Sequence, residues 1–136
     1  MNKVLVVEDN SDFRQTLCSA LNKKMPGIVL YEVSNGLEAV QKFDDLSPDI
    51  ILMDIALPVM NGLEATKILK RSRNPSWIVI VSGHDIPEYM EAAKKSGADY
   101  FLSKNSIKLD EIIELIRDLL SRDDLLSKKS EAFRIL

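Results

Sequence analysis

Residues 49–62, DIILMDIALPVMNG, decide how the rest of the chain is interpreted. The segment opens with an apolar run typical of a buried strand, and this run ends in a carboxylate, Asp54. Pro58, Asn61 and Gly62 follow, which predicts that the chain turns directly after the strand. The neighbouring sequence offers no cation to this acid. Asp54 therefore needs partners from elsewhere in the chain.

Five apolar runs rich in Val, Ile and Leu, of which the last is the weakest, predict β-strands at residues 3–8, 28–33, 49–53, 77–82 and 99–103. The first, third and fourth runs are almost continuously apolar and do not alternate with polar residues. Such runs are typical of parallel strands that are covered on both faces.

Helical periodicity fills the segments between these strands. It is clearest after the last strand, where apolar residues recur at helical spacing at Leu109, Ile112, Ile113, Ile116, Leu119 and Leu120. Residues 86–97 predict another helix, with Asp85 as its N-cap and Gly97 as its stop. The pentapeptide NGLEA, at 35–39 and again at 61–65, predicts a turn that opens a helix. Alternating strands and helices predict an α/β fold, in which helices cover both faces of a parallel sheet.

The 136 residues fit a single domain, which we expect over residues 1–121. The last apolar stripe lapses after Leu120, because its next positions are polar at Asp123, Asp124 and Ser127. Residues 122–136 have only scattered apolar positions. A frayed tail, a short extra helix and a linker to a further domain all fit them, and we favour a tail or a linker.

Composition excludes several classes of function. Eighteen basic and twenty-one acidic residues give a net charge of −3, so direct nucleic-acid binding by this chain is not expected. No apolar run reaches the roughly 18 residues of a membrane span, and no signal peptide precedes the first strand. The one cysteine, Cys18, excludes an internal disulfide and fits a cytoplasmic protein, where we expect it to serve packing. One Cys and one His do not make a zinc site.

Polar side chains stand at the ends of four predicted strands: Glu8 and Asp9, Asp54, Ser82, and Lys104. Because the carboxyl ends of parallel strands emerge at one edge of the sheet, we expect these residues to share one crevice. Three clustered carboxylates repel one another, and Lys104 supplies a single positive charge. A divalent cation with oxygen ligands would balance the group, and Mg²⁺ suits such a site.

This combination of groups favours phosphoryl chemistry. A carboxylate such as Asp54 can attack a phosphoryl group and carry it as an acyl phosphate. A metal ion and Lys104 would offset charge on the transferring oxygens, and Ser82 could donate a hydrogen bond to one of them. Taken singly, each residue has an ordinary explanation: the acids Glu8 and Asp9 would favour the start of the next helix, and Lys104 would be a solvated charge. The presence of all these residue types at four strand ends favours a phosphoryl-transfer site.

The chain resembles the receiver domain of two-component response regulators over about residues 3–121. Four motifs carry the resemblance: VVEDN at 6–10, MDIALPVMNG at 53–62, VSGHD at 81–85 and GADYFLSK at 97–104. The resemblance implies a flavodoxin-like, doubly wound (βα)5 sheet with strand order 2-1-3-4-5.

The resemblance also implies roles for individual residues. Asp54 would be the phosphoacceptor, and Mg²⁺ would be held by Asp9, Asp54, Glu8 through water, and the backbone carbonyl of Ala56. Ser82 and Lys104 would contact the phosphoryl group. Phe101 would be the aromatic that changes rotamer together with Ser82, although it could equally be plain core, and an exposed or alternately placed ring would favour the switch.

The chain departs from the family in several places. Asn105 follows the lysine where most members have a proline, and Gly83 stands where a small residue such as alanine is usual. Phe101 replaces the more frequent tyrosine, so an inward ring could not depend on a phenolic hydrogen bond. The acidic pair begins with Glu8 where Asp is commoner.

The function implied is that of a phosphorylation-dependent signalling switch and not of an enzyme with turnover. A histidine kinase or phosphotransfer protein would donate the phosphoryl group, and the surface of helix four, strand five and helix five would pass the change to an output partner, with room for a homodimer formed on phosphorylation. Two rivals stay open: a phosphate-independent interaction module, and an aspartate-nucleophile phosphohydrolase. Many such hydrolases use an Asp two positions after the nucleophile, where this chain has Ala56.

Overall fold

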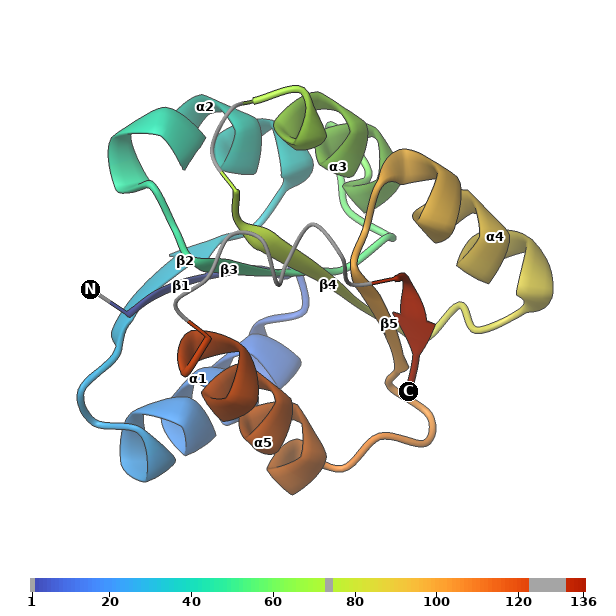
Figure 1. Ribbon diagram of the computed structural model, residues 1–136. Coiled ribbons are helices and arrows are strands. Elements are labelled where there is room, and N and C mark those ends of the chain that lie inside the picture. Colours follow the sequence, from blue (N-terminus) through green and yellow to red (C-terminus); the bar gives the residue numbers. More distant parts are fainter. Residues whose placement is uncertain (1, 73–74, 123–131) are drawn as a thin grey trace.

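A six-stranded parallel sheet forms the centre of the molecule, with strand order β2-β1-β3-β4-β5-β6 (Figure 1). The computed structural model describes residues 2–72, 75–122 and 132–136. The strands are β1 Lys3–Val7, β2 Val29–Val33, β3 Ile50–Met53, β4 Trp77–Ser82, β5 Tyr100–Ser103 and β6 Arg134–Ile135. The first five confirm the predicted strands to within one residue at each end, and their order confirms 2-1-3-4-5.

Five helices cover this sheet on both faces, as expected for a doubly wound fold. They are α1 Ser11–Lys24, α2 Gly36–Leu46, α3 Gly62–Lys70, α4 Pro87–Ser96 and α5 Leu109–Leu120. Helices α1 and α5 lie on one face, and α2, α3 and α4 lie on the other (Figure 1). None of the helices within the described residues combines the length and the apolar composition that a membrane crossing requires.

Two apolar clusters, one on each face of the sheet, make up the core. Val4 and Val6 pack in the cluster that includes residues of α1 and α5, whereas Leu5 and Val7 pack in the cluster that includes residues of α2, α3 and α4. Successive residues of a strand point to opposite faces, so a strand with helices on both sides must be apolar throughout. Burial on both faces therefore explains the unbroken apolar runs in the sequence.

The two NGLEA segments open α2 and α3, as predicted. Asn35 caps α2 by accepting the Glu38 N–H, and Asn61 caps α3 in the same way. The glycine that follows each cap lies against backbone. A Cβ added at Gly36 would lie 2.2 Å from the Met60 carbonyl oxygen, and one added at Gly62 would lie 1.9 Å from the Asp54 carbonyl oxygen. The loop between β3 and α3 is therefore packed against both helix starts.

Helix α4 begins differently from the prediction. Its N-cap is Ile86, which makes no side-chain capping bond, and not Asp85. The Asp85 carboxylate instead accepts hydrogen bonds from Ser103 Oγ at 2.7 Å and from Asn105 Nδ2 at 3.1 Å. A side chain engaged with the next strand cannot turn back to its own helix. The predicted stop at Gly97 is confirmed, with φ at 99° in the left-handed region.

Residues 132–136 return to the sheet as an edge strand. β6 runs parallel to β5, and the backbone N–H groups of Arg134 and Leu136 donate to the carbonyl oxygens of Asp99 and Phe101 at 3.1 and 2.9 Å. An edge strand was not among the three alternatives considered for residues 122–136. The polar positions 123, 124 and 127 lie outside the described residues, and the division of the chain at residue 121 stays a prediction.

Candidate functional site

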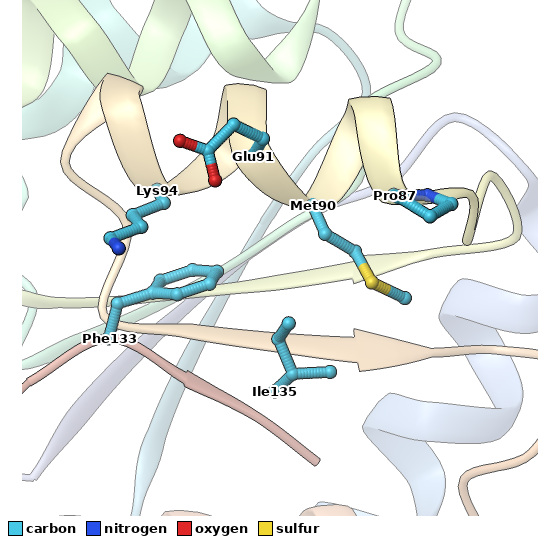
Figure 2. A pocket seen from close by; sticks show the side chains of 6 residues that line it. All are labelled: Pro87, Met90, Glu91, Lys94, Phe133 and Ile135. Atoms are coloured by element: carbon cyan, nitrogen blue, oxygen red, sulfur yellow. The ribbon is translucent and has the colours of Figure 1, made fainter.

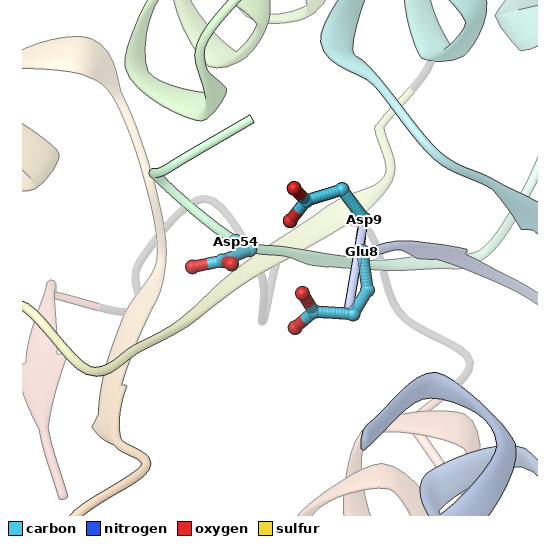
Figure 3. Close-up of side chains that lie close together, drawn as sticks. All are labelled: Glu8, Asp9 and Asp54. Carbon is cyan, nitrogen blue, oxygen red and sulfur yellow. The ribbon is translucent and has the colours of Figure 1, made fainter. Parts of the chain in front are cut away.

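The ends of β1 and β3 bring three carboxylates together. Glu8 and Asp9 follow β1 directly, and Asp54 follows β3, its neighbour in the sheet. The Asp54 N–H donates to the Val7 carbonyl oxygen at 3.0 Å, which ties the two strand ends to each other. One carboxylate oxygen from each of the three acids lies within 4.8 Å of the other two (Figure 3). The predicted convergence of these acids is present.

Lys104, which follows β5, provides the cation that the local sequence around Asp54 lacks. Its Nζ lies 2.5 Å from Glu8 Oε1 and 3.2 Å from Asp54 Oδ2, so one ammonium group bridges two carboxylates. The same Nζ lies 4.5 Å from the ring centroid of Phe13, which adds a cation–π contact. The lysine is thus held over the site by groups from three different elements.

Burial and charge both shift the ionisation of this group. The side chains of Glu8 and Asp54 belong to residues only 3% and 6% exposed, whereas Asp9 is exposed. Burial, followed by the charge of Asp54, raises the pKa of Glu8 despite its hydrogen bond from Lys104. Burial alone would lower the pKa of Lys104, but the two carboxylates outweigh it and raise that pKa. The lysine therefore stays charged beside the two carboxylates that it contacts.

Backbone donors and the first turn of α1 hold the acids in place. The Asn10 N–H donates to Glu8 Oε2 at 3.1 Å, and the Ile55 N–H donates to Asp54 Oδ1 at 2.8 Å. Arg14 Nη1 donates to the Glu8 carbonyl oxygen at 2.6 Å and pairs through Nε with Glu32. Asn10 also caps α1.

Sequence reasoning missed three of these supporting residues: Asn10, Phe13 and Arg14. An asparagine directly before a helical stripe was a usable signal for the cap. Phe13 lies at helical spacing from Leu17 and Leu21, which indicates packing, and its contact with Lys104 depends on a residue far along the chain. The sequence held no signal for Arg14, because its partners are Glu8, directly after β1, and Glu32 in β2.

Ser82 lies at the carboxyl end of β4, next to β3, and is fully buried. Its Oγ accepts the His84 N–H at 3.0 Å. Among the described residues its hydrogen bond is to its own loop and not to Asp54. A hydroxyl that accepts one bond still has its own hydrogen to donate. Ser82 is therefore near the acids by strand order, and its predicted contact with a phosphoryl group remains a prediction.

Phe101 is fully buried on β5, within the cluster on the α2, α3 and α4 face. The exposed ring that would favour a switch role is not seen here, so that role depends on the family resemblance. Apolar packing holds the ring inward without a phenolic hydroxyl. Ala56 is an exposed residue of the loop after Asp54, and its proposed carbonyl ligand also stays a prediction.

The position after Lys104 links two loops at the site. Asn105 Nδ2 donates to the Gly83 carbonyl oxygen at 3.0 Å and to Asp85 at 3.1 Å. Both acceptors lie between β4 and α4. The side chain that stands in place of the usual proline thus ties the loop after β5 to the loop after β4, a link that the sequence pattern does not predict.

Comparison with known proteins agrees with this geometry. The family model described as the response regulator receiver domain matches residues 4–117. The chain belongs to this family. One relative is the chemotaxis protein CheY of Halobacterium salinarum, to which this chain is 31% identical over 119 residues. The alignment covers 88% of this chain and 97% of that protein.

Longer proteins contain a similar receiver domain. The chain is 37% identical over 120 residues to a protein-glutamate methylesterase/protein-glutamine glutaminase of Halalkalibacterium halodurans, covering 87% of this chain and 34% of that protein. It is 34% identical over 106 residues to the transcriptional regulatory protein YdfI of Bacillus subtilis, covering 78% of this chain and 50% of that protein. The chain spans about a third to a half of these two relatives, so their whole-protein activities do not transfer to it.

Solved receiver structures share the fold. The receiver domain of the Francisella response regulator 1452 superposes with a TM-score of 0.81 at 27% identity, covering 91% of this chain and all of that one. The response regulator domain of Thermotoga maritima CheB gives a TM-score of 0.74 at 31% identity, covering 91% and 99%. The predicted receiver fold of two-component signalling is confirmed.

Proposed function

We propose that this receiver domain accepts a phosphoryl group on Asp54 from a histidine kinase or a phosphotransfer protein. The observation that carries the proposal is the cluster of Glu8, Asp9 and Asp54 within 4.8 Å, with Lys104 paired to two of the three acids. An inert interaction module would have no need to bury two carboxylates beside a third. The complete set of acids and lysine therefore favours chemistry over shape alone.

The donor set fits Mg²⁺. Carboxylate oxygens within 4.8 Å of one another can share one small cation, and the exposed Asp9 leaves the group open to a hydrated ion from solvent. Glu8, Asp9 and Asp54 would hold the ion, together with the carbonyl of Ala56. When bound, Mg²⁺ would supply positive charge for the phosphoryl oxygens.

The chain's own residues would perform the transfer as follows. A carboxylate oxygen of Asp54 forms the bond to phosphorus, while the bond between phosphorus and the donor's histidine nitrogen breaks and its electron pair returns to that nitrogen. Lys104, already bonded to Asp54 Oδ2, would orient the acceptor and offset charge on the phosphoryl group. The free O–H of Ser82 would donate to one phosphoryl oxygen. The product is an aspartyl phosphate.

The added charge would shift the population between two packings of the domain. Phosphate carries about −1.5 to −2 near neutral pH, which would draw Lys104 and Ser82 inwards and change the surface of α4, β5 and α5. An output partner, an attached effector domain or a second copy of the chain would respond to that surface. We place this phosphorelay step in the cytoplasm, with which the single Cys18 accords.

Phosphorylation from a small donor tests the proposal. The purified chain is incubated with acetyl phosphate and Mg²⁺, and intact mass is followed over time. We expect slow addition of one phosphoryl group, lost with a chelator and in Asp54→Asn, but kept in the control Asp45→Asn on α2, a conversion of an exposed acid outside the site. Sustained phosphate release over many turnovers would instead indicate a phosphohydrolase. A chain that neither gains mass nor binds Mg²⁺ would be the inert module.

A further inference from the structure

The edge of β5 is closed by the chain itself. Strand β6 pairs with β5 in parallel register, with Arg134 opposite Tyr100 and Ile135 opposite Phe101. An open sheet edge presents unpaired N–H and C=O groups, to which any extended segment can add as a new strand. Residues 132–136 occupy that position here, beside α4 (Figure 1). The edge thus accepts an extended segment, and the structure shows the orientation in which it does so.

Side chains of this segment enter a groove against α4. Phe133 and Ile135 are two residues apart, so they project to the same face of the strand. They form one wall of a groove of about 430 Å³, and α4 forms the other (Figure 2). The α4 residues that line it are Pro87, Met90, Glu91 and Lys94. The groove therefore combines an apolar floor with one acidic and one basic side chain.

The described pairing of this segment with β5 is short. The strand has two residues, and the backbone N–H groups of Arg134 and Leu136 donate to β5. Ile135 stays 53% exposed although it lines the groove, so the groove is not filled. Two residues of pairing and partial burial are close to the limit of what keeps a strand in place. Elements with little protected backbone and partly exposed side chains are the ones that open locally most readily.

We propose that residues 132–136 are a built-in strand ligand, which closes the β5 edge and the α4 groove in cis and can leave to open this surface to an extended apolar segment of a partner protein. The matching partner segment runs parallel to β5 and has large apolar side chains two residues apart. We expect the groove to discriminate little between partner segments of different charge, because it is lined by one acidic residue, Glu91, and one basic residue, Lys94.

The contact also touches the centre of β5. The Leu136 N–H donates to the Phe101 carbonyl oxygen at 2.9 Å, and Ile135 is the register partner of Phe101. Any movement of β5 at Phe101 therefore changes the hydrogen bonding that keeps residues 132–136 docked. The proposal itself rests on the sheet edge and the groove, and it holds whether or not Asp54 accepts phosphate.

A matched pair of substitutions tests the docked state. Leu136→Ala and Leu136→Pro both remove the exposed leucine side chain, but only proline also removes the N–H that bonds to Phe101. Backbone NMR of the full chain, without phosphodonor or Mg²⁺, follows the amides of Arg134, Met90 and Lys94. We expect Leu136→Pro to speed hydrogen exchange at Arg134 by about tenfold or more, while Leu136→Ala stays close to the unchanged chain.

A peptide in trans tests the docking site. The probe is a capped peptide with the sequence AFRIL, a copy of residues 132–136. We expect it to bind the Leu136→Pro chain and to shift the amide signals of β5 and α4. Its apparent affinity for the unchanged chain should be lower, in proportion to the fraction of molecules in which the site is open. A second variant, Ile135→Asp, should behave like Leu136→Pro, because it removes an apolar side chain from the groove.

Three outcomes would overturn the proposal. The first is equal exchange at Arg134 in the proline and alanine variants. The second is equal peptide affinity for open variants and unchanged chain. The third is a dimer whose β6 signals depend on protein concentration, because the strand would then come from a second copy. Since no phosphodonor is present, a failure here is distinct from a failure of Asp54 to accept phosphate.

Discussion

Gly62, the first residue of α3, lies directly against the carbonyl oxygen of Asp54. A Cβ added at Gly62 would stand 1.9 Å from that oxygen, far inside van der Waals contact, and 3.0 Å from the Met53 side chain. The close contact at the start of α3 therefore fixes the position of the backbone where it leaves β3. The position of the proposed phosphoacceptor depends on the absence of a methyl group on the next helix.

Gly62→Ala should destabilise the fold, because either the helix start or the end of β3 must move. We expect a loss of about 2 kcal/mol or more in the free energy of unfolding, measured by urea denaturation. Gly27→Ala is the matched control, since a Cβ there meets nothing within 4 Å. A Gly62→Ala chain as stable as the Gly27→Ala chain would mean that the contact is easily relaxed.

Val59 should tolerate replacement by glycine with a gain in stability. Its φ of 67° lies in the left-handed region, which is strained for a β-branched residue, and its side chain is 77% exposed. Val59→Gly should raise the free energy of unfolding by about 1 kcal/mol. Val59→Ala keeps the Cβ and should gain less. If alanine and glycine gave the same change, backbone strain would not be the cause.

Mg²⁺ should stabilise the folded chain through its acids. A ligand that binds only the folded state raises the melting temperature with its concentration, so we expect Tm to increase between chelator and millimolar Mg²⁺. Asp9→Asn should abolish this increase with little change in the metal-free Tm, because Asp9 is exposed. Asp45→Asn, on α2, should retain the full increase. An unchanged Tm in Mg²⁺ would count against the metal site.

Cys18 should resist alkylation in the folded protein. Burial, followed by the neighbouring charge of Glu32, raises the pKa of its thiol to about 12, so the reactive thiolate is scarce at pH 8. Intact mass after an iodoacetamide pulse should show no label in buffer and one label in urea. Glu32→Gln lowers the pKa only in part, because burial remains, and should stay protected. Labelling of the native chain would show that α1 opens locally.

Asp85 should titrate below its ordinary pKa of 3.8. Hydrogen bonds from Ser103 and then Asn105 lower the pKa of this carboxyl by favouring its charged form. A lowered pKa stabilises the fold fully above the ordinary value, and this contribution disappears as pH falls through the lowered one. NMR titration of the carboxyl carbon measures it. Ser103→Ala should move the pKa up more than Asn105→Ala, and no upward movement in either would refute the assignment.

The central sheet could be predicted from sequence because one physical requirement, burial on both faces, determines its residues. Strands covered on both faces need continuous apolar side chains, and helices between them need apolar stripes. Parallel strands then bring Glu8, Asp9, Asp54 and Lys104 to one edge, whatever their separation along the chain. The acid cluster follows from strand direction, so the sequence suffices to predict it.

What could not be predicted depends on surfaces that exist only after folding. Residues 134 and 135 form a strand because β5 has an open edge and α4 offers a groove, and two residues carry too little pattern to show this. The position of Asp85 before the helix is typical of an N-cap, but Ser103 at the end of β5 and Asn105 in the loop after it bind its carboxylate instead. Asn105 itself gained a role only because its amide reaches Gly83. Tertiary partners overrode local preference in each case.

Trp77, the one tryptophan of the chain, begins the strand that Ser82 ends. Its buried indole lies 6.2 Å from the ring of Tyr100 and 5.6 Å from the guanidinium of Arg122, at the opposite end of β4 from the acids. Six residues of extended backbone separate the two ends by roughly 16 Å. Fluorescence excited selectively at tryptophan therefore comes from a single site remote from the acids, and an emission change on adding a phosphodonor would reveal that the disturbance reaches the far end of β4.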